Sequence, residues 1–169
     1  MLKPSIFISY KRNNQASADV VEGLETSLRA AGFEILRDVN IEAGNLWSND
    51  LYKWLMECSA AIAVVGPEAA QSEWCRREWW FLRERHRTSG LPVIPVCVNG
   101  SHESAGILDE SQALKFPAAF EGDLLPRLKG LQAAKPTAEN YLAAHHAWLR
   151  WQFNDAPIWG REPFSLRDI

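Results

Sequence analysis

Four short apolar runs recur along the first hundred residues, separated by segments with helical periodicity. They cover residues 5–9, 33–36, 60–65 and 92–98 and are rich in β-branched and aromatic side chains. Their length and their lack of polar alternation are typical of strands buried on both faces. The last run contains two prolines, which a strand tolerates at its start or at an edge of a sheet. The pattern therefore predicts four strands.

Three helices are predicted between these runs. The first follows Asn13 and Asn14, either of which can cap it, and ends at Gly32, which suits a left-handed C′ position. The third begins after Ser72, a good N-cap residue, and runs to about Arg87. The second helix carries four apolar side chains on one face: Leu51, Trp54, Leu55 and Cys58.

Regular alternation of strands and helices predicts a doubly wound α/β fold. Right-handed crossovers place helices on both faces of its parallel sheet. Ligands of such sheets bind outside the carboxyl ends of the strands. Binding residues are therefore expected in three segments of the sequence: 9–13, 37–44 and 66–78.

The pattern weakens after residue 100. Residues 113–120 can hold a fifth short strand, and residues 138–153 predict an amphipathic helix. The segment 154–169 contains two prolines and a glycine and has no periodicity. We predict one domain over residues 1–153 and a linker over 154–169 that leads to a further domain absent from this chain.

Composition and charge narrow the class of protein. The chain has 169 residues and a net charge of −3, which argues against a general nucleic-acid binder. Its three cysteines form no CxxC pair, as expected of reduced thiols in a cytoplasmic protein. No apolar run reaches the roughly 20 residues that span a bilayer, and no signal peptide is evident, so no membrane association is expected.

The sequence lacks the motifs of several common kinds of functional site. The four histidines lack the spacing of a metal site, so no metal is expected. Neither a GxGxxG nor a P-loop sequence occurs, which argues against a dinucleotide dehydrogenase or an NTPase. A phospho-receiver would need acidic residues after the first strand, where this chain has Ser9, Tyr10 and Lys11.

Three segments together resemble the conserved boxes of TIR domains. FISYKRN at 7–13 is similar to their first box, RDVNIEAG at 37–44 to their BB loop, and SEWCRRE at 72–78 to the start of their third helix. All three occur in the family's order and spacing. The resemblance implies a flavodoxin-like TIR fold, with a parallel sheet of about five strands.

TIR domains comprise protein-interaction modules and enzymes that cleave NAD+, and the enzymes use a glutamate on a helix. The residue at the matching position is Glu78. The first box, with Lys11 and Arg12, is similar to that of the animal axon-degeneration NADase and its bacterial relatives. The resemblance implies an NAD+ glycohydrolase that releases nicotinamide and ADP-ribose, or a cyclic form of it, with NAD+ as substrate and no cofactor.

The same resemblance implies how such an enzyme is used. Its partners would be other TIR domains, through activating self-association, and a fused oligomerisation or sensor domain. The parent would then be a bacterial immune protein acting in anti-phage defence. The alternative is a non-enzymatic module that signals by TIR–TIR interaction.

A single carboxylate suits this reaction. Nicotinamide in NAD+ is already cationic and leaves without protonation, while the ribose passes through an oxocarbenium-like state that a carboxylate stabilises. Trp74 lies four residues before Glu78, so the two share a helix face. The alternative is that Glu78 is a solvated helix residue paired with Arg77 or Arg85.

Candidate binding residues accompany Glu78. Lys11 and Arg12 follow the first strand and are expected to hold the pyrophosphate, or else to be solvated. Ser9 and Tyr10 are expected to line the same cleft.

Three further residues complete the binding candidates. Asp38 would bond a ribose hydroxyl or cap the BB loop. Trp47 would stack on a base or on nicotinamide, or pack in the core. Trp74 would form an aromatic wall beside the carboxylate, although large apolar anchoring is the usual role of tryptophan.

Overall fold

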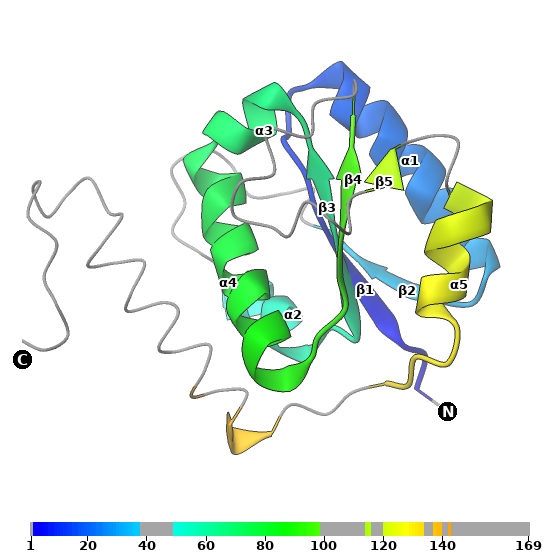
Figure 1. Cartoon of the computed structure of the whole chain (residues 1–169), viewed down its shortest axis with the longest axis vertical. Helices are drawn as coiled ribbons and strands as arrows, with labels where there is room; N and C mark the ends of the chain where they lie inside the picture. The colour runs from blue at the N-terminus through cyan, green and yellow to red at the C-terminus, as the bar shows by residue number, and fades with distance from the viewer. Residues whose placement is uncertain are drawn as a thin grey trace, which may run out of the picture.

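A five-stranded, all-parallel sheet forms the centre of the molecule (Figure 1). The computed structural model describes residues 2–37, 49–98, 114–115, 120–133, 137–139 and 142. The strand order is β2-β1-β3-β4-β5, which is the flavodoxin-like order. The strands are β1 (Ser5–Ser9), β2 (Glu34–Leu36), β3 (Ala60–Val65), β4 (Val93–Cys97) and β5 (Leu114–Lys115). The predicted fold class is therefore confirmed.

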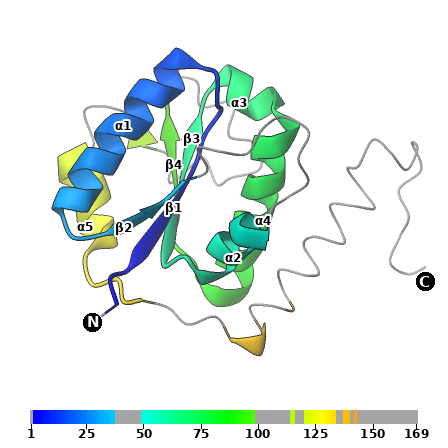
Figure 2. The same cartoon turned by 180° about the vertical axis from the view of Figure 1, so that it is seen from behind.

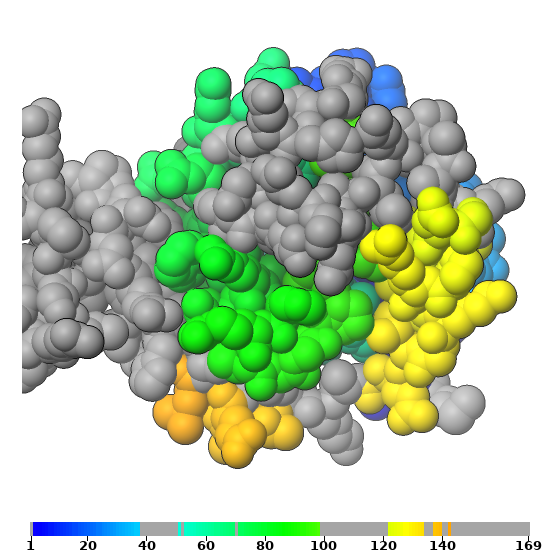
Figure 3. Space-filling view, viewed as in Figure 1, coloured from blue at the N-terminus to red at the C-terminus, as the bar shows by residue number. Residues whose placement is uncertain are grey.

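Helices cover both faces of the sheet, as the views from front and back show (Figures 1 and 2). The helix α1 (Gln15–Ala30) lies on the same face as α5 (Leu125–Leu128), which follows a π-helical turn (Phe120–Leu124). The other face carries α2 (Asn49–Glu57) and α4 (Glu73–Ser89). In the space-filling view, α4 in green and the 120–133 segment in yellow lie on opposite flanks (Figure 3).

Alternating side chains of β1 divide the core into two layers. Ile6 and Ile8 pack with the buried face of α1 and with Leu124 and Leu128. Phe7 packs on the opposite side, with residues of α2 and α4. The burial of β1 and β3 on both faces agrees with the apolar sequence of β3 and of the centre of β1.

Helix α3 (Pro67–Gln71) is one element that the sequence pattern missed, and the helical segment formed by the π-helical turn and α5 is another. The Gly-Pro pair at 66–67 is a typical strand stop, and β3 does end at Val65. Pro67 also occupies the first turn of α3, where its fixed φ suits a helix start and its missing N–H costs nothing. The same pair therefore ends a strand and begins a helix.

The predicted helix caps of α1 and α4 are present. Of the two asparagines, Asn14 is the N-cap of α1, and its Oδ1 accepts a hydrogen bond from the Ser17 amide at 2.9 Å. Ser72 caps α4 by accepting from the Cys75 amide at 3.4 Å. Helix α4 ends at Ser89, slightly beyond the predicted Arg87, at a left-handed Gly90.

Pro95 lies inside β4, which is not an edge strand. It is paired with Ala63 of β3, while the ladder between β4 and β5 begins at Val96. Within the part of the chain that the structure describes, Pro95 therefore has a strand neighbour on one side. This edge-like position explains how an inner strand accommodates a residue without an N–H.

Gly32 follows α1 with φ of +97°, as its predicted left-handed role requires. A Cβ there would meet no atom within 4 Å, so substitution is opposed by backbone strain alone. We expect Gly32→Ala to lower the free energy of unfolding by about 1–2 kcal/mol in urea titrations. Gly66→Ala is the control, because Gly66 is extended and equally uncrowded. Equal stability of both variants would contradict the assignment.

Some predictions fall on residues that the structure does not describe. They concern residues 38–44 of the BB loop, which include Asp38, and also Trp47, the linker over 154–169, and all but residues 138, 139 and 142 of the C-terminal helix. Those three residues are helical. No helix among the described residues is long and apolar enough to cross a membrane.

Candidate active site at the carboxyl edge of the sheet

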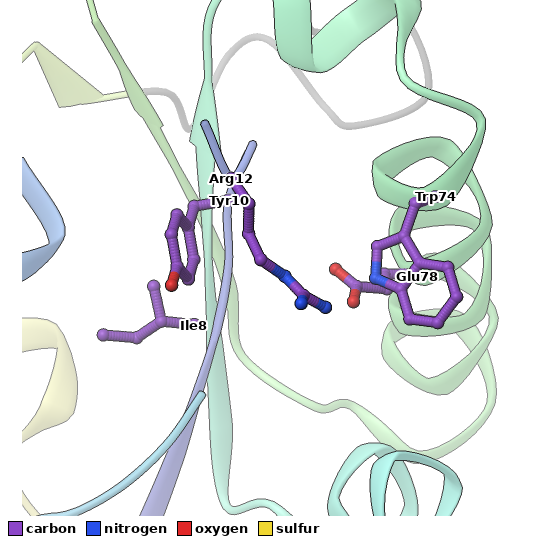
Figure 4. A pocket seen from close by; sticks show the side chains of 5 residues that line it. All are labelled: Ile8, Tyr10, Arg12, Trp74 and Glu78. Carbon is purple, nitrogen blue, oxygen red and sulfur yellow. The ribbon is translucent and has the colours of Figure 1, made fainter. Parts of the chain in front are cut away.

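A pocket opens where the chain leaves β1. Its lining consists of Ile8, Tyr10, Arg12, Trp74 and Glu78 (Figure 4). The first three come from β1 and the segment after it, and the other two project from α4. Because β2 and β3 lie on opposite sides of β1, this is the switch point at which doubly wound sheets bind ligands.

Glu78 lies in the second turn of α4 and is nearly inaccessible, with 3% of its surface exposed. The Ser9 hydroxyl, itself 1% exposed, donates a hydrogen bond to Glu78 Oε2. Alternation along β1 explains this contact, since Ser9 and Phe7 face the side of the sheet covered by α4. Burying a carboxylate is costly unless it is hydrogen-bonded, and Ser9 meets part of that need.

The alternative interpretation of Glu78 as a solvated helix residue is wrong, because its side chain is buried. Arg77 forms an ion pair with Glu73 at 3.6 Å. Arg85 directs its Nη1 to the carbonyls of Leu55 and Cys58, at 2.8 and 3.1 Å. The hydrogen bond from Ser9 orients the Glu78 carboxylate toward the sheet.

Two guanidinium groups contact the Trp74 ring. Arg12 lies 6.0 Å and Arg77 5.8 Å from its centroid, within the range of cation–π attraction. Figure 4 shows the Arg12 side chain extending toward the Glu78 carboxylate. Burial lowers the pKa of Arg77, while the charges of Glu73 and Glu78 act in the opposite direction. The aromatic ring thus holds cationic groups close to a buried carboxylate.

The pKa of the Cys75 thiol responds to the charged groups around the pocket. Its pKa is raised to about 12, mainly by burial and in part by the charge of Glu78, while the hydrogen bond with Ser72 and the charges of Lys11 and Arg12 act in the opposite direction. Burial likewise raises the pKa of Cys58 to about 11. Both thiols therefore stay protonated in the folded protein at neutral pH, which makes them poor nucleophiles.

The buried cysteines give a direct prediction. All three are buried thiols outside any disulfide, so the native protein at pH 8 should react with a thiol-specific chromogenic disulfide at least about tenfold more slowly than the unfolded protein. Because the folded-state pKa values of Cys58 and Cys75 exceed the ordinary value of 9.0, their contribution to stability is complete below about pH 9 and is lost as pH rises toward 12. Rapid labelling of the native protein at pH 8 would contradict the expected protection of the three thiols.

The structure brings most of the predicted site residues together. Tyr10, Arg12, Trp74 and Glu78 line the pocket, and Ser9 contacts it through Glu78. Lys11 is half-buried and does not line the pocket. Asp38 and Trp47 lie outside the described residues.

Sequence reasoning missed two residues of this region. Ile8 lines the pocket although its buried strand position marked it only as core, and Arg77 contacts Trp74. Arg77 could have been found from its spacing, because residues three apart on one helix, such as Trp74 and Arg77, lie side by side. Among the described residues, no cluster of three His, Cys, Asp or Glu side chains could hold a metal ion.

Comparison with known proteins agrees with this geometry. The family profile described as "TIR domain" matches residues 6–128. A curated "TIR domain-containing protein" of Arabidopsis thaliana is 26% identical over 98 residues, which cover 58% of this chain and 38% of that protein. The match thus spans well under half the length of that relative.

Two solved structures are also similar. The TIR domains of the activated Roq1 resistosome, which directly recognises the pathogen effector XopQ, align with a TM-score of 0.52 at 20% identity, over 91% of this chain and 92% of that one. A metazoan TIR-STING receptor from C. gigas aligns with a TM-score of 0.49 at 20% identity, over 90% of this chain and 46% of that one.

The flavodoxin-like strand order and the lining of the pocket beside β1 define an α/β domain with a pocket at its switch point. The family profile covers most of that domain, and the chain belongs to the TIR domain family.

Proposed function

We propose that this TIR domain is an NAD+ glycohydrolase of the type found in bacterial immune proteins, with Glu78 as its catalytic carboxylate. The observation that carries the proposal is a buried glutamate, oriented by Ser9, in a pocket at the switch point of the sheet. A carboxylate held in such a place resists hydration and keeps a fixed direction, which suits stabilisation of a developing positive charge.

The chemistry follows from the groups present. The bond between the ribose C1 carbon and the nicotinamide nitrogen breaks, and its electron pair leaves with nicotinamide, which becomes neutral. Glu78 stabilises the positive charge that develops on the ribose. Water then adds to C1 and loses a proton to give ADP-ribose; attack by an adenine nitrogen would instead give a cyclic product.

The other residues bind and orient the substrate. Arg12, which reaches into the pocket, offers charge-assisted hydrogen bonds to the pyrophosphate, and neighbouring Lys11 adds positive charge. Trp74 provides an aromatic wall beside Glu78 on which a pyridine or a purine ring can stack. Tyr10 lines the opposite side of the pocket.

Activity is proposed to require assembly. One similar structure is that of the TIR domains of an activated resistosome, and the curated relative is much longer than its matched region. We infer that this domain acts within a larger protein whose other parts bring TIR domains together, as in anti-phage defence. Self-association with other TIR domains would then activate the enzyme.

Nicotinamide release tests the proposal. The protein is clustered on nickel-bearing vesicles or by a fused oligomerising tag, incubated with NAD+, and followed by chromatography of nicotinamide, ADP-ribose and cyclic product. Release by the clustered protein that Glu78→Ala abolishes is expected. If every clustered form assembles but none releases nicotinamide, the enzymatic proposal fails and a non-enzymatic TIR–TIR interaction module remains.

A further inference from the structure

A hydrogen bond between side chains links the two segments that flank the pocket. Asn14 Nδ2 donates to Glu68 Oε2 at 2.8 Å, across 54 residues of sequence. Asn14 ends the segment after β1, and Glu68 belongs to α3, which follows β3. The bond therefore crosses the carboxyl edge of the sheet, from the strand on one side of the switch point to the strand on the other.

Asn14 uses both ends of its amide. Its Oδ1 accepts from the Ser17 amide at 2.9 Å and so starts α1, while its Nδ2 donates to Glu68. Capping alone requires only an oxygen, which Ser, Thr or Asp would supply equally well. Asparagine differs from these residues in carrying an NH2 group that is separate from its capping oxygen, so one side chain can cap α1 and also donate to Glu68.

The short segment that carries Arg12 is consequently held at both ends. At its start, Ser9 is fixed to Glu78 by the buried hydrogen bond. At its end, Asn14 is fixed to Glu68. Between them Asn13 adopts a left-handed conformation, with φ of +59°, which turns the chain sharply before α1. Asparagine tolerates this conformation better than most residues.

Glu68 is also connected along the chain to α4, the helix that carries Trp74 and Glu78. Helix α3 is separated from α4 by Ser72 alone, whose backbone ends the first helix and whose side chain caps the second. A contact made at Glu68 therefore fixes the Arg12 segment relative to α4, where Arg12 meets the Trp74 ring.

We propose that Asn14 and Glu68 form a latch that positions Arg12 for substrate binding. The inference rests on the proposed function and extends it to two residues outside the pocket. Neither residue touches the substrate. The latch acts through Arg12, which it holds over Trp74, whereas Glu78 keeps its separate anchor on Ser9. Loss of the latch should therefore weaken substrate binding and leave the chemical step nearly unchanged.

Reversing the bond tests the latch. Asn14→Asp retains the cap on Ser17 but replaces the donor with a second carboxylate facing Glu68. The double variant Asn14→Asp/Glu68→Gln restores a hydrogen bond of opposite polarity, because the introduced glutamine amide can donate to the introduced aspartate. Asp19→Ala is the matched control, because it removes an exposed hydrogen bond of 2.7 Å to Gln15 that stays within α1.

Three measurements read the result on the assembled protein: hydrogen exchange of the 10–13 amides, the dissociation constant for ADP-ribose, and kcat and KM for nicotinamide release. We expect Asn14→Asp to speed exchange and to raise both the dissociation constant and KM by roughly 3- to 10-fold, the range of a single hydrogen bond. The value of kcat should stay within about twofold. The double variant should recover most of the loss, and Asp19→Ala should resemble the unaltered protein.

The outcomes separate the latch from the proposed enzyme. Unchanged exchange in Asn14→Asp, failure of the double variant to recover, or faster exchange with unchanged ADP-ribose binding would each overturn the latch. If the unaltered protein releases no nicotinamide, the glycohydrolase proposal fails, while exchange and ADP-ribose binding still decide the latch.

Discussion

Glu78→Gln is expected to lower kcat for nicotinamide release by about a thousandfold or more, with little loss of stability. Glutamine keeps the shape of the side chain and an oxygen that accepts from Ser9, but it removes the negative charge. A preorganised electrostatic group in a water-poor site typically contributes two to three orders of magnitude to kcat, and a lone catalytic carboxylate should lie at the upper end or beyond.

The burial of Glu78 makes this isosteric change more informative than truncation. Glu78→Ala would leave a cavity and deprive the buried Ser9 hydroxyl of its acceptor, so part of its effect could come from altered packing. With glutamine, the free energy of unfolding should stay within about 1 kcal/mol of the unaltered protein. Urea titration and circular dichroism on the same samples would separate a chemical loss from a structural one.

Glu84→Gln provides the matched control. Glu84 lies on the same helix and is 9% exposed, but its carboxylate forms an ion pair with Arg87 at 2.8 Å and does not line the pocket. We expect the kcat of Glu84→Gln to stay within about twofold of that of the unaltered protein. Similar losses in Glu78→Gln and Glu84→Gln would show that α4 tolerates no change of charge, and would remove Glu78 from its proposed role.

The sequence predicted the fold well because its signals are local. The strands β3 and β4 are uninterrupted apolar runs, and β1 has an apolar centre between two serines. Asn14, Gly32 and Ser72 mark helix boundaries by chemistry that neighbouring residues decide. Helix α3 was missed because a five-residue helix has no full period to detect, and because Gly66 and Pro67 indicate a strand end equally well.

The site was predicted only in part, because its contacts are not local. Glu78, Arg12 and Trp74 were found through the conserved boxes and helical spacing. Their geometry depends on Ser9 meeting Glu78 across 69 residues and on Asn14 meeting Glu68 across 54. No periodicity encodes such pairs; the order of the strands creates them. Nothing in the sequence indicated that Arg85 would donate to two backbone carbonyls rather than pair with Glu78.

Arg85→Met is expected to lower the free energy of unfolding by about 2–4 kcal/mol. Arg85 is 3% exposed, and its Nη1 donates to the carbonyls of Leu55 and Cys58 at 2.8 and 3.1 Å, at the end of α2. The last carbonyls of a helix have no partners within it and form the negative end of its dipole. A guanidinium therefore satisfies both hydrogen bonding and charge at this buried helix end.

Replacing a buried charge by an apolar residue is often neutral when its partners are replaced as well. Here the partners are main-chain carbonyls that remain, and each buried acceptor without a donor costs about 1–3 kcal/mol. Methionine fills much of the volume of arginine, so cavity formation contributes little and the loss should come from the two carbonyls. Arg85→Lys should lie in between, because one ammonium group cannot reproduce the reach of a guanidinium.

Urea unfolding at pH 7 would measure these differences as shifts in midpoint at constant slope. Arg83→Met is the control, since Arg83 is an exposed arginine of the same helix whose guanidinium contacts the Trp80 ring, at 5.9 Å from its centroid. Its loss should cost no more than about 1 kcal/mol. If Arg85→Met unfolds at the same urea concentration as Arg83→Met, the end of α2 does not depend on Arg85, and packing between α2 and α4 must hold that helix in place.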